Sequence, residues 1–594
     1  LYKNMEKVAK TKKDKLSVVL RYYLHYALWI VLALGFLTCE AVCELELPSY
    51  MSSIISDGIM SSDLTEVLRI GGIMLAIALA SCCSSIIVSF LASRVGAGMS
   101  KDLRADIFDK VLSFSSKEYN AFSVSSLITR STNDITQIQI FTIVFLRMVM
   151  YAPIMGIGGI IKAVNTASGI SALGIVVGVA LAVVVCVIIV LMLVVLPRFT
   201  KIQKQVDEVN RVAREGLTGM MVVRAFNTQK HEEERFEAAN MALTKSNLFV
   251  NRVMSLLMPL ITILMNGVSV ATVWVAALFV EDYVAVANMM AFMQYAIQII
   301  MSFMMISMVF ILLPRAVVAM RRVSEVLSTQ PSIVDPEGKE NPEGIRLKGE
   351  IEFRDVAYNY GGSENAVEHI SFTASPGETV AIIGPTGSGK STVINLIPRL
   401  ADASEGSVLI DGRDVREYNV DDLRRNIGFV PQKNILFSGT IASNLRMGDE
   451  NATDEQLRKA AEIAQAEEFI SEKPEGINDP IAQGGTNVSG GQKQRLAIAR
   501  ALVKKAPIYI FDDSFSALDF KTDAALRSAL AENMKDSTVI IVAQRVGTIM
   551  NADRIIVLDD GRIAGVGTHR ELLETCEVYN QIARSQLSEE DLKR

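Results

Sequence analysis

The sequence predicts a helical membrane domain followed by a separate α/β domain. The chain has 594 residues, half of them hydrophobic, and a single hydrophobic core rarely grows beyond about 250–300 residues. Residues 1–325 carry long uncharged apolar runs, whereas residues 346–594 mix short apolar segments with polar ones, as soluble α/β sequences do. We therefore expect a transmembrane domain over 1–327, a linker over 328–347 and a second domain over 348–594.

The clearest membrane segment is 173–196, LGIVVGVALAVVVCVIIVLMLVVL, which contains no charged residue. A helix needs about 20 apolar residues to cross a bilayer. The valine and isoleucine content favours a strand locally, but strands are much shorter than this run. Five further segments have sufficient length and apolarity, which gives six expected spans: 27–55, 66–95, 136–163, 251–280 and 284–313.

An even number of spans places both termini on one side of the membrane. Positive charge marks the cytoplasmic side, and the loops 99–135 and 198–253 are basic, whereas the opposite loops are short and acidic or neutral. The start of the chain adds further positive charge through Lys3, Lys7, Lys10, Lys12, Lys13 and Lys15. We expect a multi-pass protein of the inner (cytoplasmic) membrane with both termini in the cytoplasm.

Two long cytoplasmic connections, 117–135 and 210–236, are too polar for lipid and rich in helix-forming residues. We interpret them as extensions of the membrane helices, each carrying a short contact helix; plain solvated hairpins are the alternative. The linker at 328–347 is dense in proline, glycine and charge. The net charge of −6 gives no reason to expect a nucleic-acid partner.

The strongest motif is GPTGSGKST, which fits the phosphate-binding pattern G-x-x-x-x-G-K-[ST]. It follows a strand-like TVAII and precedes a helical VINLIPRL, the context in which backbone N–H groups and a helix N-terminus bind phosphates. Lys390 is expected to reach the terminal phosphates of ATP, and Ser391 to ligate Mg²⁺. The loop comprises Gly384, Pro385, Thr386, Gly387, Ser388, Gly389, Lys390, Ser391 and Thr392.

Asp512 ends a second strand-like run, IYIF, and is placed to act as a magnesium carboxylate. Between the two motifs, VSGGQKQR at 488–495 opens another helical stretch. One triphosphate in one globular unit seldom needs two such helix N-termini. We infer that the second serves an ATP molecule held mainly by another chain.

These motifs resemble those of the ATP-binding cassette (ABC) superfamily, in the exporter type whose membrane domain precedes the nucleotide domain. The resemblance covers essentially the whole chain. It implies that Tyr360 stacks on adenine and that Gln432 is the Q-loop glutamine, which would join Ser391 and Asp512 around Mg²⁺. It further assigns the signature Ser489, Gly490, Gly491 and Gln492, and the D-loop 516–519 with Ser516 and Asp519.

The resemblance also implies a fold and an assembly. We expect six exporter-type transmembrane helices fused to a P-loop nucleotide-binding domain with a helical subdomain. Two such nucleotide domains pair head to tail and enclose two ATP molecules between each phosphate loop and the opposite signature. The coupling helices would lie near 117–122 and 212–222.

The chain departs from the family at three positions. Asp513 replaces the catalytic glutamate, Gln544 replaces the switch histidine, and Gln483 precedes the signature where many relatives have glutamate. An aspartate carboxylate falls about 1.5 Å short of a glutamate carboxylate, and losing general-base help costs about 10²–10⁴ in rate. Glutamine also cannot become a cation.

Because the signature and D-loop are intact, we expect a heterodimer. This chain would hold a degenerate, slowly hydrolysing ATP site and lend its signature to a second half-transporter that has both glutamate and histidine. A slow but working homodimer is the alternative.

The membrane half offers weaker hints about cargo. Glu40 and Glu44 share one face of the first span and must face protein or a wet cavity. Their place in the outer half of the membrane favours a vestibule lining over direct substrate contact. Arg147 is interpreted as reaching the inner headgroups. Span six is rich in methionine, which suits promiscuous apolar ligands and helix packing equally: Met289, Met290, Met293, Met301, Met304, Met305 and Met308.

The sequence therefore predicts ATP-driven export of a small amphipathic or hydrophobic compound from the cytoplasm or the membrane lipid. A lipid flippase, an exporter-fold importer and an ATP-gated channel remain alternatives. The identity of the substrate and of the partner is not determined by the sequence.

Overall fold

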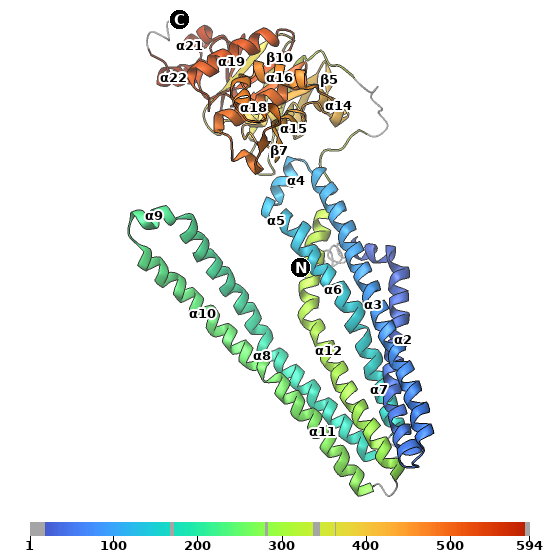
Figure 1. The fold of residues 1–594 in the computed structure, drawn as a ribbon. Helices are drawn as coiled ribbons and strands as arrows, with labels where there is room; N and C mark the ends of the chain where they lie inside the picture. The colour runs from blue at the N-terminus through green and yellow to red at the C-terminus, as the bar shows by residue number, and fades with distance from the viewer. Residues whose placement is uncertain (1–17, 167–170, 280–282, 337–344, 363, 589–594) are drawn as a thin grey trace. The chain divides into compact units, whose positions relative to one another are not determined.

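The computed structural model describes residues 18–166, 171–279, 283–336, 345–362 and 364–588, which pack as two compact units (Figure 1). The first unit comprises Leu1–Leu112 and Val124–Thr329, and the second comprises Ser113–Ser123 and Gln330–Arg594. The amino-terminal lysines and part of the expected linker lie outside the described residues. The expected boundaries at 327 and 348 therefore stay predictions.

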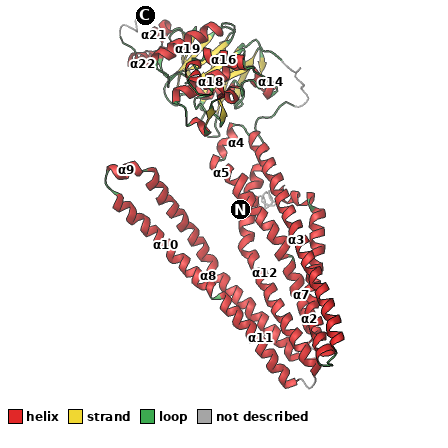
Figure 2. Ribbon diagram, viewed as in Figure 1, coloured by secondary structure: helices red, strands yellow, loops and turns green. Residues whose placement is uncertain are grey.

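The first unit is entirely helical in its described part (Figure 2). Its membrane-domain elements before the long hairpin are α2 (Ala27–Ser53), η1 (Ile54–Ile59), α3 (Leu64–Leu112), α5 (Val124–Thr129), η2 (Arg130–Asp134), α6 (Ile135–Val144), η3 (Phe145–Val149) and α7 (Tyr151–Thr166). The remaining ones are α8 (Ser171–Thr218), α9 (Met220–Ala225), α10 (Gln229–Ser255), α11 (Leu257–Phe279) and α12 (Tyr283–Ser328). Six helical stretches of the described chain are long and apolar enough to span a membrane, as the sequence predicts.

The expected helical extensions are present, because α3, α8 and α12 continue well past the length that a bilayer requires. The second short contact helix differs from the expectation at 212–222. Helix α8 continues to Thr218, the helix is interrupted at Gly219, and the short helix α9 follows. Helix α8 continues through Gly216, because the neighbouring alanine, arginine, glutamate and leucine favour helix, and it ends just before the second glycine, Gly219.

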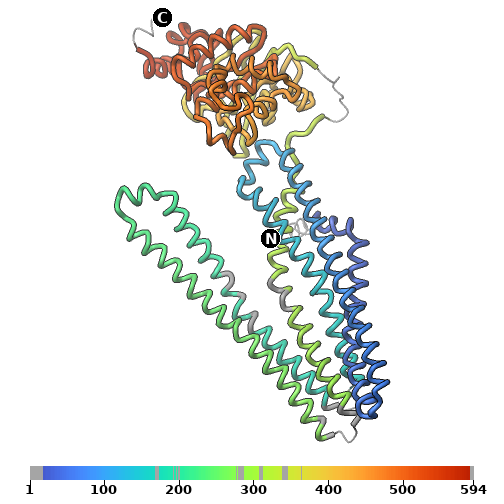
Figure 3. Tube along the Cα trace, in the orientation of Figure 1, coloured from blue at the N-terminus to red at the C-terminus, as the bar shows by residue number. Residues whose placement is uncertain are grey.

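Packing in the first unit centres on α2, α7 and α12. Tyr295 and Phe292 of α12 are buried against Ala41 of α2 and Met155 of α7. Polar contacts fix the register of α12 on α2, since the hydroxyl groups of Tyr295 and Ser49 lie 2.7 Å apart. The hairpin of α8 and α10 runs side by side, joined at one end by α9, as the tube in Figure 3 shows.

The second unit contains three sheets. A six-stranded sheet has the order β12-β11-β3-β10-β9-β6, a four-stranded sheet has the order β2-β1-β4-β5, and β7 pairs with β8. The strands are β1 (Ile351–Tyr358), β2 (Val367–Ala374), β3 (Thr379–Ile383), β4 (Glu405–Ile410), β5 (Arg413–Asp414), β6 (Ile427–Val430), β7 (Gly439–Thr440), β8 (Pro480–Ile481), β9 (Ile508–Asp512), β10 (Thr538–Val542), β11 (Arg554–Asp559) and β12 (Arg562–Gly567).

Helices cover these sheets and build a separate helical portion around α15 to α18. They are α13 (Lys390–Leu396), η4 (Val415–Glu417), α14 (Val420–Arg425), α15 (Ile441–Leu445), α16 (Asp454–Ile463), α17 (Glu467–Ser471), η5 (Gly476–Asn478), η6 (Gln483–Gly485), α18 (Gly490–Val503), α19 (Phe520–Asn533), α20 (Val546–Ile549), α21 (His569–Thr575) and α22 (Glu577–Gln586). The expected strands at 379–383 and 508–511 are confirmed. The expected helix after the first strand is α13, and the expected helix opened by the signature is α18.

The order of the large sheet determines where its loops meet. Strands β3, β10 and β9 are parallel neighbours with β10 in the middle. The carboxyl ends of parallel strands lie at one edge of the sheet, and ligands bind there in open α/β folds. The loops after β3, β9 and β10 carry Gly384, Asp513 and Gln544, so the sheet gathers the predicted site at a single edge.

The short helix α4 (Ser116–Ala121) lies in the second unit rather than with the membrane helices around it in the chain. Ser115 and Glu118 form a capping box at its start. The Ser332 hydroxyl lies 2.8 Å from the Ser115 hydroxyl and 3.3 Å from Oε2 of Glu118. Helix α4 is therefore tied to the segment that enters the nucleotide domain, close to the place expected for the first contact helix.

Candidate nucleotide-binding site

The phosphate loop between β3 and α13 depends on glycine at two crowded positions. Gly384 packs so closely on the next strand that an added Cβ would lie 2.0 Å from the Leu558 carbonyl oxygen. Gly389 has φ of +91°, and a Cβ there would lie 2.3 Å from Val367 Cγ1. These glycines keep the loop compact, which leaves its backbone N–H groups free to surround an anion.

Lys390 begins α13 and folds back over the loop. Its Nζ donates hydrogen bonds to the carbonyl oxygens of Gly384, at 2.8 Å, and Pro385, at 2.7 Å. Burial lowers the pKa of Lys390, although the carboxylates of Asp512 and Asp513 oppose that shift. The Ser388 hydroxyl is a third partner of Nζ at 3.4 Å. A half-buried ammonium group held by the loop itself is placed to bind a phosphate oxygen.

Ser391 and Asp512 lie together at the edge of the sheet. The Ser391 hydroxyl donates to Oδ2 of Asp512 at 3.1 Å. Burial raises the pKa of Asp512, and the neighbouring charge of Asp513 adds to the shift. A hydroxyl group beside a buried carboxylate is the hard oxygen donor set that Mg²⁺ prefers, so these residues fit the ion.

Asp513 adopts a left-handed backbone conformation with φ of +47°. Its N–H donates to the Val542 carbonyl at 2.9 Å, which ties the turn to the end of β10. Gln544, in the loop after β10, donates from Nε2 to Oδ2 of Asp513 at 3.2 Å. Burial raises the pKa of Asp513, and a hydrogen bond from Gln432 partly offsets this. The two departures from the family pattern therefore contact each other directly.

A cavity of about 340 Å³ lies beside the phosphate loop. The Tyr360 hydroxyl lies 3.0 Å from Oγ1 of Thr392, and the ring of Tyr360 is exposed and packs edge-on against Tyr358. An exposed ring beside the phosphate loop is available for stacking on a base. The lining residues are Tyr360, Ala366, Thr386, Gly387, Gly389, Lys390, Ser391, Thr392, Gln432 and Gln544.

The signature residues do not line this cavity in the described chain. Ser489 caps α18, where its hydroxyl accepts from Gln492 N–H and the Gln492 side chain accepts from Ser489 N–H. Gly490 and Gly491 form the first turn of α18, and Gln483 lies in the short turn η6 just before it. The N-terminus of α18 is thus formed and capped, and its residues do not line the cavity beside the phosphate loop of the same chain.

Hydrogen bonds to the turn at Asp513 and to the start of α19 hold the D-loop in place. The Ser516 hydroxyl donates to the Asp513 carbonyl at 3.1 Å. Asp519 caps α19 and accepts from the Thr522 N–H at 3.0 Å, a hydrogen bond that lowers the pKa of Asp519. The first bond closes the turn at Asp513, and the second caps the start of α19.

Sequence reasoning missed the residue that links signature and D-loop. Gln494 of α18 is 3 % exposed, donates to the Asp513 carbonyl at 3.2 Å and accepts from the Ala517 N–H at 3.1 Å. Arg545 adds a hydrogen bond to the Ser516 carbonyl at 3.3 Å. The signal that was available is a glutamine that shares one helix face with the apolar Ala497, Ile498 and Ala501, because a buried amide needs partners.

Two family models match the chain. One described as the ABC transporter covers residues 367–516, and one described as the ABC transporter transmembrane region covers residues 30–303. The chain belongs to the ABC transporter family. With its membrane domain fused ahead of one nucleotide domain, it is a half-transporter of the exporter type, a multi-pass membrane protein whose nucleotide domain implies ATP-driven transport.

The chain is also similar to individual proteins along most of its length. It is 39 % identical to an uncharacterized ABC transporter ATP-binding protein of Mycobacterium tuberculosis, over 92 % of this chain and 94 % of that protein. It is 37 % identical to the ABC transporter ATP-binding protein YfiB of Bacillus subtilis, over 95 % and 97 %. An ATP-dependent lipid A-core flippase of Desulfotalea psychrophila is 33 % identical over 82 % and 84 %.

The fold has a solved counterpart. The structure of a bacterial Atm1-family ABC exporter with ATP bound superimposes with a TM-score of 0.75 and 23 % identity, over 96 % of this chain and 99 % of that chain. The predicted fold class, an exporter-type helical membrane domain fused to an ABC nucleotide-binding domain, is confirmed.

Proposed function

We propose that this chain is the ATP-holding half of a heterodimeric exporter that moves amphipathic or hydrophobic compounds out across the cytoplasmic membrane. Its own ATP site would bind nucleotide and hydrolyse it slowly. Its signature would complete the site of a partner half-transporter that carries glutamate and histidine at the matching positions. Both termini would lie in the cytoplasm, where ATP is available.

The observation that carries the proposal is the contact between Gln544 and Asp513. A general base must have a carboxylate free to orient the attacking water. Here the aspartate side chain is shorter than that of glutamate. Its carboxylate already accepts a hydrogen bond from the amide of Gln544, and Gln432 is a second donor. Gln544 also supplies no positive charge to the developing transition state. Both effects slow hydrolysis without removing the groups that bind the phosphates.

The phosphate-binding groups themselves support nucleotide binding. Lys390 would leave the loop carbonyls for the terminal phosphates, and the loop N–H groups would hold the remaining oxygens. Ser391, Gln432 and Asp512 would hold Mg²⁺, which neutralises phosphate charge when bound. Tyr360 would carry the adenine ring.

Two features support a partner chain. The N-terminus of α18 favours an anion, but its residues do not line the cavity beside the phosphate loop of the same chain. In addition, the short helix α9 has no buried residue; its Met221 is 79 % exposed, and Phe226, which directly follows the helix, is 76 % exposed. Exposed apolar side chains at a helical tip mark an interaction surface.

The experiment compares ATP hydrolysis by the purified chain, alone and assembled with its partner, in lipid nanodiscs. The chain alone should hydrolyse ATP slowly, and the double change Asp513→Glu with Gln544→His should raise its rate by at least about tenfold, because it restores the base and the charge. In the assembled transporter, Asp513→Asn should lower the rate by less than about half.

The control is Lys390→Ala, which removes the phosphate-binding ammonium group and should abolish nucleotide binding at this site. Brisk hydrolysis by the chain alone that Asp513→Asn abolishes would contradict the proposal and favour a working homodimer.

A lipid flippase is a second candidate, favoured by the similarity to proteins named ATP-dependent lipid A-core flippase. ATP-dependent transfer of a fluorescent phospholipid between leaflets of reconstituted vesicles tests it. Transfer that requires the partner's catalytic glutamate, together with an absence of solute accumulation, would favour the flippase. An importer or a channel would instead show uptake in the opposite direction or flux that continues without turnover.

A further inference from the structure

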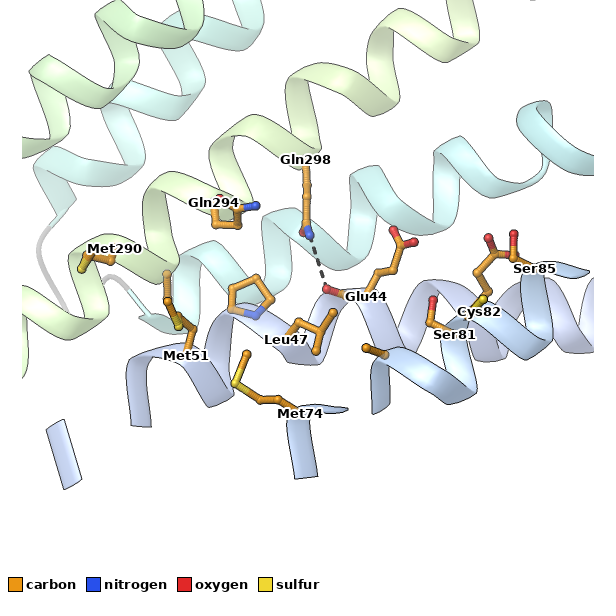
Figure 4. A pocket seen from close by; sticks show the side chains of 14 residues that line it. Glu44, Leu47, Met51, Met74, Ser81, Cys82, Ser85, Met290, Gln294 and Gln298 are labelled. Atoms are coloured by element: carbon orange, nitrogen blue, oxygen red, sulfur yellow. Dashed lines mark hydrogen bonds between the residues drawn. The ribbon is translucent and has the colours of Figure 1, made fainter. Parts of the chain in front are cut away.

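The first unit contains a cavity of about 750 Å³ between α2, α3 and α12 (Figure 4). Volumes of 300–1,000 Å³ are typical of sites for small organic ligands. The lining comes from this chain alone and consists of Glu40, Glu44, Leu47, Pro48, Met51, Met74, Ala78, Ser81, Cys82, Ser85, Met290, Ala291, Gln294 and Gln298.

The charge in this cavity has one sign. Glu40 and Glu44 of α2 are both half-buried and lie one turn apart. Among the described residues that line the cavity there is no lysine or arginine. Arg147 acts electrostatically on Glu40 but is not part of the lining. The Glu44 carboxylate also accepts a hydrogen bond from the Tyr151 hydroxyl. Carboxylates partly shielded from water interact with a cation more strongly than fully exposed ones do.

Polar groups on the facing helix are arranged to accept a ligand. Gln298 of α12 points toward Glu44 and donates from Nε2 to its carbonyl oxygen at 3.3 Å (Figure 4). The Oε1 atom of Gln298 is buried without a hydrogen-bond partner. A buried carbonyl without a partner is unfavourable, and a ligand that donates a hydrogen bond or brings positive charge would relieve that cost.

The other end of the cavity is apolar and adaptable. Leu47 and three methionines, Met51, Met74 and Met290, line it. Methionine side chains change shape at little cost and suit ligands of varied outline. The cavity is also much larger than an ion site, and no three His, Cys, Asp or Glu side chains of the described residues are placed to hold a metal ion.

We propose that this cavity binds an amphipathic organic cation, with its charged group at Glu40 and Glu44 and its apolar body against Met51, Met74 and Met290. The inference rests on the proposed export function and specifies its substrate class. It also separates this chain from a carrier of anionic lipids, since two carboxylates disfavour an anionic headgroup.

The test uses two probes of the same size and apolarity but opposite charge, tetraphenylphosphonium and tetraphenylborate. Binding of each is measured by equilibrium dialysis on the full chain in nanodiscs. The double change Glu40→Gln with Glu44→Gln should weaken phosphonium binding by at least about tenfold, because two attractive charges are lost, and should not weaken borate binding.

Glu46→Gln is the matched control. Glu46 lies on the same helix but pairs with Lys162, 2.6 Å away, outside the lining. Its variant should keep phosphonium affinity within about twofold. Equal phosphonium affinity in the wild type and the double variant, or equal losses for both probes, would overturn the proposal.

A second measurement leaves both glutamates in place. Cys82 lines the cavity, so a variant that retains Cys82 as its only cysteine is labelled with an uncharged maleimide. Phosphonium should slow the labelling by at least about fivefold and borate should not; unchanged rates with phosphonium count against the site.

ATP-driven transport is measured in the same preparations to separate the two proposals. Transport without charge-selective binding overturns only the cation site. Charge-selective binding and Cys82 protection without ATP-driven transport overturn only the export function.

Discussion

At the scale of single residues, Asp513 and Gln544 are the basis of the proposed slow hydrolysis at this nucleotide site. The sequence identifies both as departures from the family pattern, but only the structure brings the Gln544 amide within 3.2 Å of the Asp513 carboxylate. The amide donates a hydrogen bond, yet it carries no charge. The left-handed backbone at Asp513 is hydrogen-bonded to Val542 and to Gln494, and these bonds fix the position of the short aspartate side chain.

A residue-scale prediction concerns the phosphate loop. Gly387 and Gly389 share a positive φ, +88° and +91°, but only Gly389 is crowded, since nothing lies within 4 Å of a Cβ at Gly387. Both alanine variants incur backbone strain of about 1–2 kcal/mol. Gly389→Ala adds overpacking of about 1–3 kcal/mol, so its midpoint of thermal unfolding without nucleotide should fall further. Equal midpoints for the two variants would contradict this account of the loop.

At the scale of elements, the short helix α4 connects distant parts of the chain. Glu118 of its capping box also accepts a hydrogen bond from the hydroxyl of Ser332, which is more than two hundred residues away in sequence. Burial acts to raise the pKa of Glu118, but hydrogen bonds from Ser115 and Ser332 outweigh it and lower the pKa below its usual value. The ionised carboxylate therefore stabilises this junction.

This junction should be sensitive to acid. Because the pKa of Glu118 is lower in the folded chain, its contribution is present above the ordinary glutamate pKa of about 4.3 and is lost as pH falls through the folded value. Glu118→Gln should cost about 1–3 kcal/mol at neutral pH and should flatten the acid side of the stability profile. Thermal unfolding of the wild type and the variant across a pH series measures both effects.

The exposed Glu472 supplies the control for the same series. Glu472→Gln should leave the profile unchanged, because its side chain is in solvent. An acid profile that is identical in the wild type and in Glu118→Gln would show that the carboxylate does not stabilise the junction.

At the scale of the whole molecule, the chain is a half-transporter whose membrane domain precedes one nucleotide domain. It holds a phosphate loop and a signature, but the cavity beside the phosphate loop is lined without the signature residues. The six candidate spans and the extensions of α3, α8 and α12 form the membrane part of that half. The orientation in the membrane remains a prediction from the distribution of positive charge.

Cysteine labelling tests that orientation. In a variant without native cysteines, Ser62→Cys lies in the exposed turn between η1 and α3, and Asn227→Cys lies in the exposed turn between α9 and α10. A membrane-impermeant maleimide should label position 62 in intact cells and position 227 only after permeabilisation. The reverse pattern would contradict cytoplasmic termini.

The sequence by itself determined the fold class and the nucleotide-binding motifs. Uncharged runs long enough to cross a bilayer leave no alternative to membrane helices, and the phosphate loop is read from local spacing because neighbouring residues in the chain form it. The strands that deliver Gly384 and Asp512 were predicted from the same local patterns.

Only the tertiary structure decided which distant side chains meet. The contact of Gln544 with Asp513, the bridge by Gln494, the tie between Glu118 and Ser332, and the joint exposure of Glu40, Gln298 and Met290 in one cavity all join segments far apart in the chain. Strand order and helix packing set these distances. Sequence periodicity predicts which face of an element is apolar, but not which neighbour that face meets.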